Sequence, residues 1–320
     1  MIKDVVIREY RPEQDVPAVA VLWESTLGAT YPVSSRVLYS RIGYRPGVET
    51  GDGWVAERSG RVVGFILADH DQTAQGVSYG MVSTILVHPD CQRQGIGTRL
   101  YRQVEQRLCA MGCTEVHATA GWFRFWSGVP ADLPDAVAFF QRQGFGLETE
   151  THDLIAPLDG PGRLPDPVNL PAGFTFGSLQ AQDLGALFAF QQMEFAGWVP
   201  SMLKILAEGD GANILVLKQD VTVVGSIQTY TPSSKWRGPN VVWERLLGEC
   251  LGGYGCVGVA RAFRGQGLGL ALCVGAMHHI ARNGGTCCLI DWTNLLEFYK
   301  KTGAVDWRCY KRGSKRLVKE

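Results

Sequence analysis

The sequence carries the same set of motifs twice, and this internal repeat limits the possible folds more than any other feature. QRQGIG at residues 92–97 recurs as RGQGLG at residues 264–269, at an offset of 172. FFQRQG at residues 139–144 recurs as FYKKTG at residues 298–303, at an offset of 159. Upstream of both, IREYRPEQDVPAV parallels FGSLQAQDLGALF at an offset of 168. Because 320 residues suffice for two domains of about 100–200 residues each, the repeat predicts two related domains.

A proline-rich segment separates the two copies. Five of the 15 prolines fall within APLDGPGRLPDPVNLPAG, where they restrict the backbone and remove hydrogen-bond donors. We therefore predict an N-terminal domain over residues 1–156, a linker over 157–172 and a C-terminal domain over 173–320. The offset falls from 172 at the glycine loops to 159 at the FFQRQG and FYKKTG segments. This difference of 13 residues places an insertion in the first copy within residues 121–134.

Each copy has a hydrophobic pattern that predicts the order β-α-α-β-β-β-loop-α-β-α-β. The clearest helix is expected over residues 96–111, with an apolar stripe that is repeated in the helix expected over 268–283. The expected fold class is α/β, with two tandem domains that each hold a twisted mixed sheet flanked by helices. Further strands are expected near residues 4–9, 53–58, 61–69, 78–87, 114–119, 151–155, 174–178, 213–218, 221–230, 254–259 and 286–291. Further helices are expected near residues 13–27, 35–43, 134–143, 181–194, 200–208 and 294–302.

Composition and charge argue against several classes of protein. The chain has 31 basic and 31 acidic residues, so nothing in its charge favours a nucleic-acid or anionic-membrane partner. No apolar stretch approaches the ~20 residues of a membrane span, and MIKDVVIREY carries charges where a signal peptide needs an apolar core. The nine cysteines have no CxxC spacing, so we expect neither a disulfide framework nor a metal site. We expect a soluble, cytoplasmic protein whose oligomeric state the sequence does not indicate.

The two glycine loops are candidate anion sites. Each follows a strand-like run and opens a helix, where unpaired backbone N–H groups and the helix dipole favour a phosphate or pyrophosphate. Glycine allows a bulky anion to approach the backbone because it has no Cβ. The sequence has no P-loop motif, and GYGCVG at residues 253–258 lies in a strand-like run with no helix after it. We therefore interpret that third glycine motif as a chance match to the dinucleotide-binding pattern.

These residues resemble a known family. The Q/R-x-x-G-x-G loop is similar to the acyl-CoA pyrophosphate loop of the GCN5-related N-acetyltransferases (GNATs). NLLEFYKKTGA at residues 294–304 is similar to the second signature of that family, N-x-x-x-x-F/Y-Y-x-x-x-G-F, and departs from it at the last position. AFFQRQGF at residues 138–145 is also similar but lacks the tyrosine. The resemblance covers nearly the whole chain as a tandem pair of GNAT-like domains.

The resemblance implies direct transfer of an acetyl group from acetyl-CoA, as co-substrate and with no metal, to the primary amine of a small molecule. The loop amides would hold the pyrophosphate, and the preceding strand would pair with the pantetheine arm and polarise the thioester carbonyl. The residues expected to bind acetyl-CoA in the second copy are Val257, Val259, Arg264, Gly265, Gln266, Gly267, Leu268, Gly269 and Asn294. Those expected in the first copy are Leu86, Val87, Gln92, Arg93, Gln94, Gly95, Ile96 and Gly97.

One substitution between the copies favours the second as the catalytic one. The family uses a tyrosine to protonate the departing thiolate, and Tyr299 matches it in the second copy. The first copy has Phe140 there, which has no proton to donate. Glu244 and Glu249 are candidate general bases because they precede the central strand of the second copy, and Asp291 is a third because it ends the fifth strand near Tyr299. Each of these carboxylates is more often a solvated surface group, and a water relay also serves in this family.

The acceptor and the role of the insertion stay open. Trp122, Phe123, Phe125 and Trp126 crowd the insertion, and they could form core, stack on a sugar or apolar acceptor, or join the two domains. We favour a domain interface. The acceptor could be an amine, an aminosugar, an amino-acid derivative or a protein amine, and longer acyl groups are not excluded. The alternative to an enzyme is an acyl-CoA-binding sensor or scaffold built on a degenerate pair.

Overall fold

The computed structural model describes residues 4–43, 52–73, 76–121, 124–160, 162–238 and 241–317. Trp122 and Phe123 of the insertion lie outside the described residues. The chain forms two compact units, which are described separately here. Unit 1 contains residues 1–151 together with 308–320, and unit 2 contains residues 152–307. Among the described residues, none of the helices is both long and apolar enough to cross a membrane.

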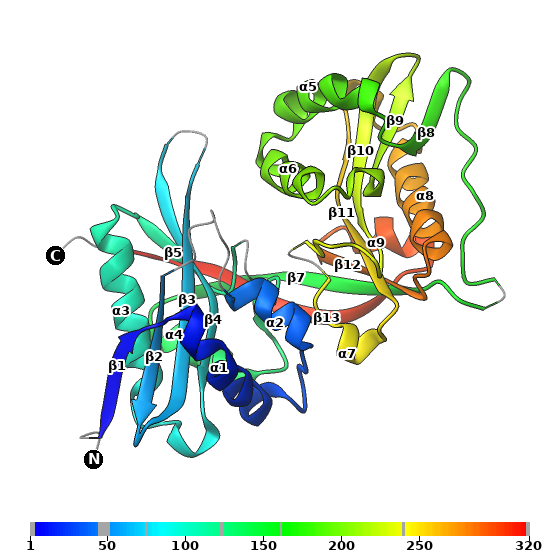
Figure 1. Cartoon of the computed structure of the whole chain (residues 1–320). Coiled ribbons are helices and arrows are strands. Elements are labelled where there is room, and N and C mark those ends of the chain that lie inside the picture. Colours follow the sequence, from blue (N-terminus) through cyan, green and yellow to red (C-terminus); the bar gives the residue numbers. More distant parts are fainter. Residues whose placement is uncertain are drawn as a thin grey trace. The chain divides into compact units, whose positions relative to one another are not determined.

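Unit 1 is a mixed sheet with helices on both faces (Figure 1). Its strand order is β1-β2-β3-β4-β5-β13-β7; the first four strands are antiparallel, whereas β5 runs parallel to β4. The strands are β1 (Val5–Glu9), β2 (Asp52–Arg58), β3 (Arg61–Gln72), β4 (Ser78–Val87), β5 (Glu115–His117), β6 (Val129–Pro130), the first part of β7 (Gly146–Pro157) and β13 (Val305–Arg316) from residue 308. The helices are α1 (Pro12–Leu27), α2 (Ser35–Ile42), α3 (Ile96–Ala110) and α4 (Pro134–Arg142).

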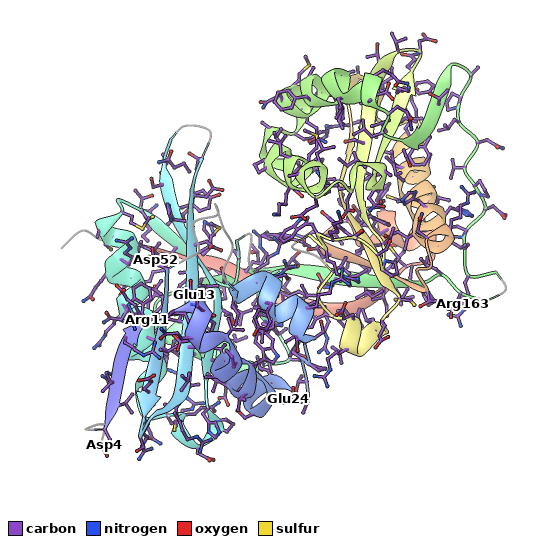
Figure 2. All side chains as sticks on the ribbon, viewed as in Figure 1. Asp4, Arg11, Glu13, Glu24, Asp52 and Arg163 are labelled. Carbon is purple, nitrogen blue, oxygen red and sulfur yellow. The ribbon has the colours of Figure 1, made fainter. Side chains whose placement is uncertain are left out.

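Helix α3 forms where the sequence predicts it. Gly95 precedes it with a left-handed φ of 79°, which a side chain would strain, and Ile96, Leu100, Val104 and Leu108 are buried against the sheet. On α1, the apolar side packs on β3 and β4, and the opposite side carries the exposed Glu13 and Glu24 (Figure 2). Both helices therefore cover the sheet of unit 1 with their apolar sides.

Unit 2 repeats this architecture. Its strand order is β7-β12-β11-β10-β9-β8, again antiparallel except for β12, which runs parallel to the central strand β11. The strands are β8 (Phe174–Ser178), β9 (Ile214–Gln219), β10 (Thr222–Tyr230), β11 (Leu251–Val259), β12 (Cys287–Thr293) and the later part of β7. The helices are α5 (Leu184–Glu194), α6 (Val199–Ala207), α7 (Glu244–Leu247), α8 (Leu268–Arg282) and α9 (Leu296–Tyr299).

Each unit is completed by a strand from the other half of the sequence. From residue 308 onward, β13 inserts into unit 1 beside β5, with Ser314 opposite His117 and Tyr310 opposite Pro130. From residue 152 onward, β7 pairs with β12 of unit 2. A Cβ on Gly313 would collide with the carbonyl of Gly146 on β7, so this pairing requires glycine at position 313. The sequence prediction had kept residues 308–320 with the C-terminal domain and had given no range for β13.

The proline-rich segment packs on unit 2 instead of spanning open solvent. Leu158 is buried in the core of that unit, and Leu164 and Leu170 pack against the same core. The carbonyl of Pro165 lies 2.9 Å from Nε2 of His278 on α8. Unit 2 begins at residue 152, five residues before the start of the predicted linker at residue 157. The residues predicted as a linker belong to unit 2.

Candidate functional site: two glycine loops beside open strand edges

The central strand of unit 1 has an open edge next to the glycine loop. Among the described residues, β4 pairs with β5 at Gly80↔Val116 and Met81↔His117, and the Ala120 N–H then donates to the Val82 carbonyl at 3.1 Å. Beyond that point the two strands separate. The remaining edge, residues 83–87, is about 13 Å long at the usual rise of ~3.3 Å per residue. Its unpaired backbone groups can pair with an extended ligand.

The loop after β4 is held by its own first side chain. Nε2 of Gln92 donates to the Val87 carbonyl at 3.0 Å, which fixes the loop to the end of the strand. Residues 92–95 are exposed, and the loop leads into the N-terminus of α3, where backbone N–H groups lack helical partners. A Cβ on Gly97 would lie 3.2 Å from the ring of Phe139, so this turn of the helix is close to α4. The exposed amides and the missing Cβ suit a bound phosphate group.

A cavity of about 550 Å³ lies along this edge and loop. Its walls come from β4, the glycine loop, the start of α3, the insertion, α4 and the end of α1. Of the residues predicted to bind acetyl-CoA, it gathers Leu86, Val87, Gln92, Arg93, Gly95, Ile96 and Gly97. Phe140 also lines it, so the position of the family's tyrosine is an apolar wall here. The cavity therefore places the exposed loop amides next to apolar side chains, an arrangement that suits a ligand with a phosphate group and an apolar arm.

The aromatic insertion belongs to the inside of unit 1. Phe125 and Trp126 are buried, with ring centroids 4.4 Å and 5.4 Å from that of Trp23 on α1. Trp126 also lines the cavity. Both rings therefore pack on α1 within unit 1, as the core alternative expects, and Trp126 closes the cavity on the α1 side.

Unit 2 has the same strand edge and loop. The pairing of β11 with β12 runs from Leu251↔Cys287 to Tyr254↔Ile290, which leaves residues 255–259 as the open edge among the described residues. Nε of Arg264 donates to the Val259 carbonyl at 3.0 Å, as Gln92 does to Val87. The loop is exposed at Arg264, Gly265, Gln266 and Gly267, and Gly267 has the left-handed φ of its counterpart Gly95. Leu268 begins α8, and Asn294 is exposed before α9.

The surroundings of this second loop differ from those of the first. The Glu194 carboxylate accepts a hydrogen bond from the Arg261 N–H at 3.3 Å and lies 3.8 Å from the Arg264 guanidinium. Phe195 and Trp198 stack at 4.2 Å, and both rings lie against Gly258 of the open edge. Side chains of α5 and of the turn after it therefore pack against the strand end and the loop of unit 2.

Tyr299 lies at the inner end of the open edge of unit 2. Its ring centroid is 6.3 Å from that of Tyr254, the last residue of β11 that pairs with β12. Burial, followed by the charges of Cys273, Asp291 and Cys256, raises the pKa of the Tyr299 phenol above its usual value of 10. The phenol therefore keeps its proton at neutral pH and can act as a donor.

Two of the three predicted bases, Glu244 and Glu249, lie nearer the start of β11. Glu244 begins α7, and one carboxylate oxygen is 3.7 Å from Nε of Arg237. Nη2 of the same guanidinium donates to the Leu251 carbonyl. Glu249 is exposed two residues before β11 begins. At ~3.3 Å per residue, Glu249 is about 20 Å and Leu251 about 13 Å along the chain from residue 255, where the open edge begins. Glu244 is linked to β11 through the Arg237 guanidinium.

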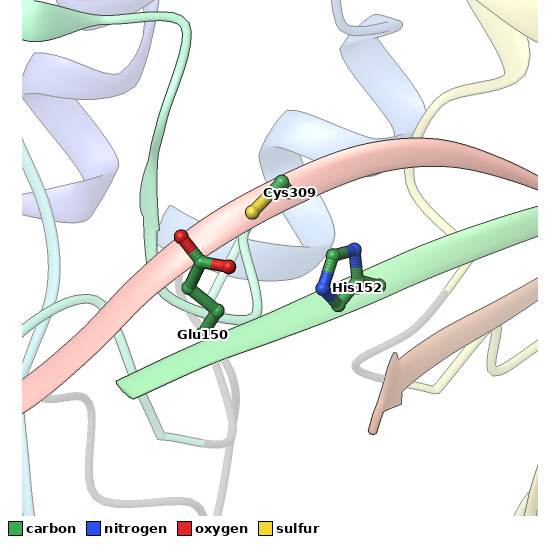
Figure 3. Close-up of side chains that lie close together, drawn as sticks. All are labelled: Glu150, His152 and Cys309. Atoms are coloured by element: carbon green, nitrogen blue, oxygen red, sulfur yellow. The ribbon is translucent and has the colours of Figure 1, made fainter. Parts of the chain in front are cut away.

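A further group of polar side chains lies on β7 and β13. Figure 3 shows Glu150 on β7 and Cys309 on β13, both in unit 1, with His152 two residues along β7. Glu150 forms an ion pair with Lys311. Burial and the charge of Glu150 raise the pKa of the Cys309 thiol, which disfavours the thiolate that binds soft metals. Glu150 and Cys309 lie on neighbouring strands of unit 1, whereas His152 pairs with Thr293 in unit 2.

Sequence reasoning missed three features of the site. They are the wall formed by Trp126, the carboxylate of Glu194 beside the second loop, and Thr119, a cavity residue with a left-handed φ of 42°. The repeat alignment could have found Glu194, because it stands where the first copy has Thr26. Nothing in the sequence around Thr119 indicates a strained backbone, since that conformation depends on where β5 stops pairing.

Comparison with known proteins agrees with this geometry. Residues 21–145 match the model of the acetyltransferase (GNAT) family. The mycothiol acetyltransferase of Frankia casuarinae is 27% identical over 237 residues, which is 71% of this chain and 62% of that protein. The glucosamine N-acetyltransferase region of a fungal multi-domain GH3 β-N-acetylglucosaminidase is 26% identical with a TM-score of 0.87, covering 97% of this chain and 38% of that one. This chain thus spans less than two thirds of the length of either relative.

Two further solved structures share the tandem arrangement or the fold. A tandem GNAT protein from the clavulanic acid biosynthesis pathway has a TM-score of 0.71 at 17% identity, over 99% of this chain and 100% of that one. A GCN5-related N-acetyltransferase from Sphaerobacter thermophilus has a TM-score of 0.71 at 19% identity, over 98% and 96% of the two chains. At these identities the likeness concerns the fold. With the repeated strand–loop–helix site and the family match, the chain is a tandem member of the GCN5-related N-acetyltransferase superfamily.

Proposed function

We propose that this protein is an N-acetyltransferase that uses acetyl-CoA and acts on the primary amine of a small molecule. The observation that carries the proposal is the open strand edge beside a glycine loop, which occurs in both units. An edge of about 13 Å matches the pantetheine arm, whose roughly twelve bonds reach about as far as four extended residues, ~14 Å. With the pyrophosphate at the loop, the thioester falls at the inner end of the edge.

Acetyl transfer is assigned to unit 2 because Tyr299 lies at that inner end. The neutral amine attacks the thioester carbon, and the bond from that carbon to sulfur breaks. The leaving thiolate takes its proton from the buried phenol, whose raised pKa keeps it protonated until then. In unit 1 the matching residue is Phe140, so that unit holds acyl-CoA without this proton donor.

Glu244 is the candidate that removes the proton from the acceptor amine, directly or through water. Val241, three residues before it, lies against Gly253, and successive strand residues face opposite sides of the sheet. Tyr254, next to Gly253, faces Tyr299. The segment of Glu244 and the phenol of Tyr299 therefore approach β11 from opposite faces, as an acid and a base on two sides of a thioester must.

The acceptor proposed first is an aminosugar. The glucosamine N-acetyltransferase region is similar to 97% of this chain, and the mycothiol acetyltransferase is a second relative that acts as an acetyltransferase. Phe195 and Trp198 offer aromatic faces beside the open edge of unit 2, and such faces suit the apolar side of a sugar ring.

The test is release of free CoA thiol from acetyl-CoA with glucosamine, other primary amines and no amine. Amine-dependent release, with acetylated product identified by mass, supports the proposal. Binding of acetyl-CoA without amine-dependent release would favour the alternative, a sensor that binds the thioester and does not consume it. No binding of acetyl-CoA would contradict the proposal itself.

A further inference from the structure

Thr119 is a buried polar residue on the wall of the unit 1 cavity. It follows β5, lines the cavity and is 4% exposed. Its Oγ1 has no hydrogen-bond partner among the described residues. Its backbone φ is 42°, a conformation that β-branched residues rarely adopt. A buried hydroxyl without a partner and a strained backbone both disfavour the folded state. A bound ligand would supply the missing partner.

The depth of Thr119 in the cavity indicates which part of an acyl-CoA it meets. The Ala120 N–H donates to the Val82 carbonyl, so Thr119 stands beside the inner end of the open edge of β4. The glycine loop lies at the outer end, beyond Val87. A pantetheine arm of ~14 Å running from the loop along this edge ends beside residue 83. The group at that point is the thioester, and its carbonyl oxygen is a hydrogen-bond acceptor.

We propose that the Thr119 hydroxyl donates a hydrogen bond to the thioester carbonyl of an acyl-CoA bound in unit 1, so that this unit distinguishes acyl-CoA from free CoA. The inference rests on the proposed use of acetyl-CoA. Free CoA ends in a thiol and has no carbonyl at this position, whereas both ligands share the pyrophosphate and the two amides of the arm.

Unit 2 has a different residue at the same place. Gly80 pairs with Val116 as Gly252 pairs with Cys288, so the position of Thr119 corresponds to Asp291. A carboxylate accepts hydrogen bonds and repels a partly negative carbonyl oxygen. The charge of Asp291 instead raises the pKa of Tyr299. Discrimination of the acyl group by a hydroxyl is therefore a property of unit 1.

The experiment compares acetyl-CoA with free CoA by calorimetric titration. It uses the full chain carrying Gly269→Trp, which blocks the loop of unit 2, with and without Thr119→Val. We expect Thr119→Val to weaken acetyl-CoA binding about 3- to 10-fold, as loss of one buried neutral hydrogen bond does, and to leave CoA binding unchanged. Thr119→Ser keeps the hydroxyl and should restore most of the difference between the two ligands.

Tyr101→Phe is the matched control. Tyr101 is buried on α3 and lies off the cavity lining, and this change also removes one buried hydroxyl. This change should alter neither affinity. Circular dichroism checks that each variant folds. If Gly269→Trp fails to fold, the same comparison uses acetyl-CoA labelled with ¹³C at the thioester carbonyl and the unblocked chain, because the bound carbonyl resonance reports the hydrogen bond.

If Thr119→Val weakened the binding of acetyl-CoA and of free CoA equally, the hydrogen bond would go to an amide of the arm and the inference would be overturned. If it weakened the binding of neither ligand, the inference would be overturned as well. In both cases acetyl-CoA still binds and the proposed function stands. Failure of acetyl-CoA to bind the wild-type chain would instead overturn the proposed function together with this inference.

Discussion

The two glycine loops of this protein are built alike and surrounded differently. In each, the first side chain of the motif, Gln92 or Arg264, holds the loop to the carbonyl that ends the central strand. At the end of α1, Thr26 and Leu27 leave room and line a cavity. At the end of α5, Glu194 and Phe195 stand in the same sequence positions and pack against the loop and the strand.

The two units therefore share a fold and differ in the side chains around the loop and the strand edge. Unit 1 has a cavity lined by Thr119, whose hydroxyl is unpartnered among the described residues, and it has Phe140 where unit 2 has Tyr299. Unit 2 has the protonated phenol of Tyr299 and a carboxylate beside its loop. The cavity of unit 1 and the phenol of unit 2 can therefore be altered by separate substitutions.

The largest expected effect is on the proton donor. Tyr299→Phe removes the phenol and keeps the ring, so kcat should fall about 100- to 10,000-fold while acetyl-CoA binding is kept. Steady-state kinetics with the best amine acceptor measures this. The matched control is Phe140→Leu, which changes the equivalent position of unit 1 without adding a proton donor and should leave kcat unchanged. A kcat that survives Tyr299→Phe and responds to substitutions in the unit 1 cavity would move the reaction to unit 1.

Next comes the capacity to bind acetyl-CoA. Gly97→Trp and Gly269→Trp each place a bulky side chain at one loop, near Phe139 and Phe298 respectively. If both loops bind, calorimetry on each variant should show one of the two binding events lost and the other kept. Loss of activity should accompany Gly269→Trp alone. Loss of both binding events in a folded Gly97→Trp variant would mean that the loops are not independent sites.

A smaller effect tests the exchange of strands. Tyr310 is fully buried on the part of β13 that belongs to unit 1. Tyr310→Ala should destabilise unit 1 by about 3–5 kcal/mol, as removal of a large buried aromatic ring does. Hydrogen exchange should then rise in peptides of α3 and β4. Val305→Ala, at a position of β13 that is 54% exposed, is the control. Faster exchange confined to residues 173–300 would contradict the assignment of the strand.

The smallest expected effect is a loss of folding stability at alkaline pH. In unit 2, burial raises the pKa of the Cys273 thiol to about 12 and that of Cys287 to about 11. Burial also raises the pKa of Cys288 well above its usual value. An unfolded thiol ionises near pH 8.5, so the unfolded chain loses protons first and stability falls as the pH rises above that value. Each thiol contributes at most ~1.4 kcal/mol per pH unit.

Urea unfolding at about pH 8 and about pH 10 measures this loss, and Cys273→Ala should reduce it. In unit 1, burial raises the pKa of Cys113, so some loss is expected there also. An equal loss in wild type and in Cys273→Ala would show that this thiol does not take part.

Much of the fold follows from local patterns. The apolar stripe from Ile96 to Leu108 and the glycine before it predict α3, and the structure places that helix at Ile96–Ala110. The family resemblance implied that the strand before each loop pairs with the pantetheine arm, and in the described part of both units one edge of that strand is open at its end. Strand β13 was given no range because KRGSKR, its second half, is polar and has no hydrophobic alternation.

The sequence by itself determined the repeat, the two loops and the substitution of Phe140 for tyrosine, because each depends on residues close together in the chain. Tertiary structure decided the partners of β13, the cavity beside the first loop, the carboxylate beside the second and the orphaned hydroxyl of Thr119. These depend on where parallel strands stop pairing and on which distant side chains fill the space that opens there. Such contacts join residues far apart in the chain, and short-range patterns do not specify them.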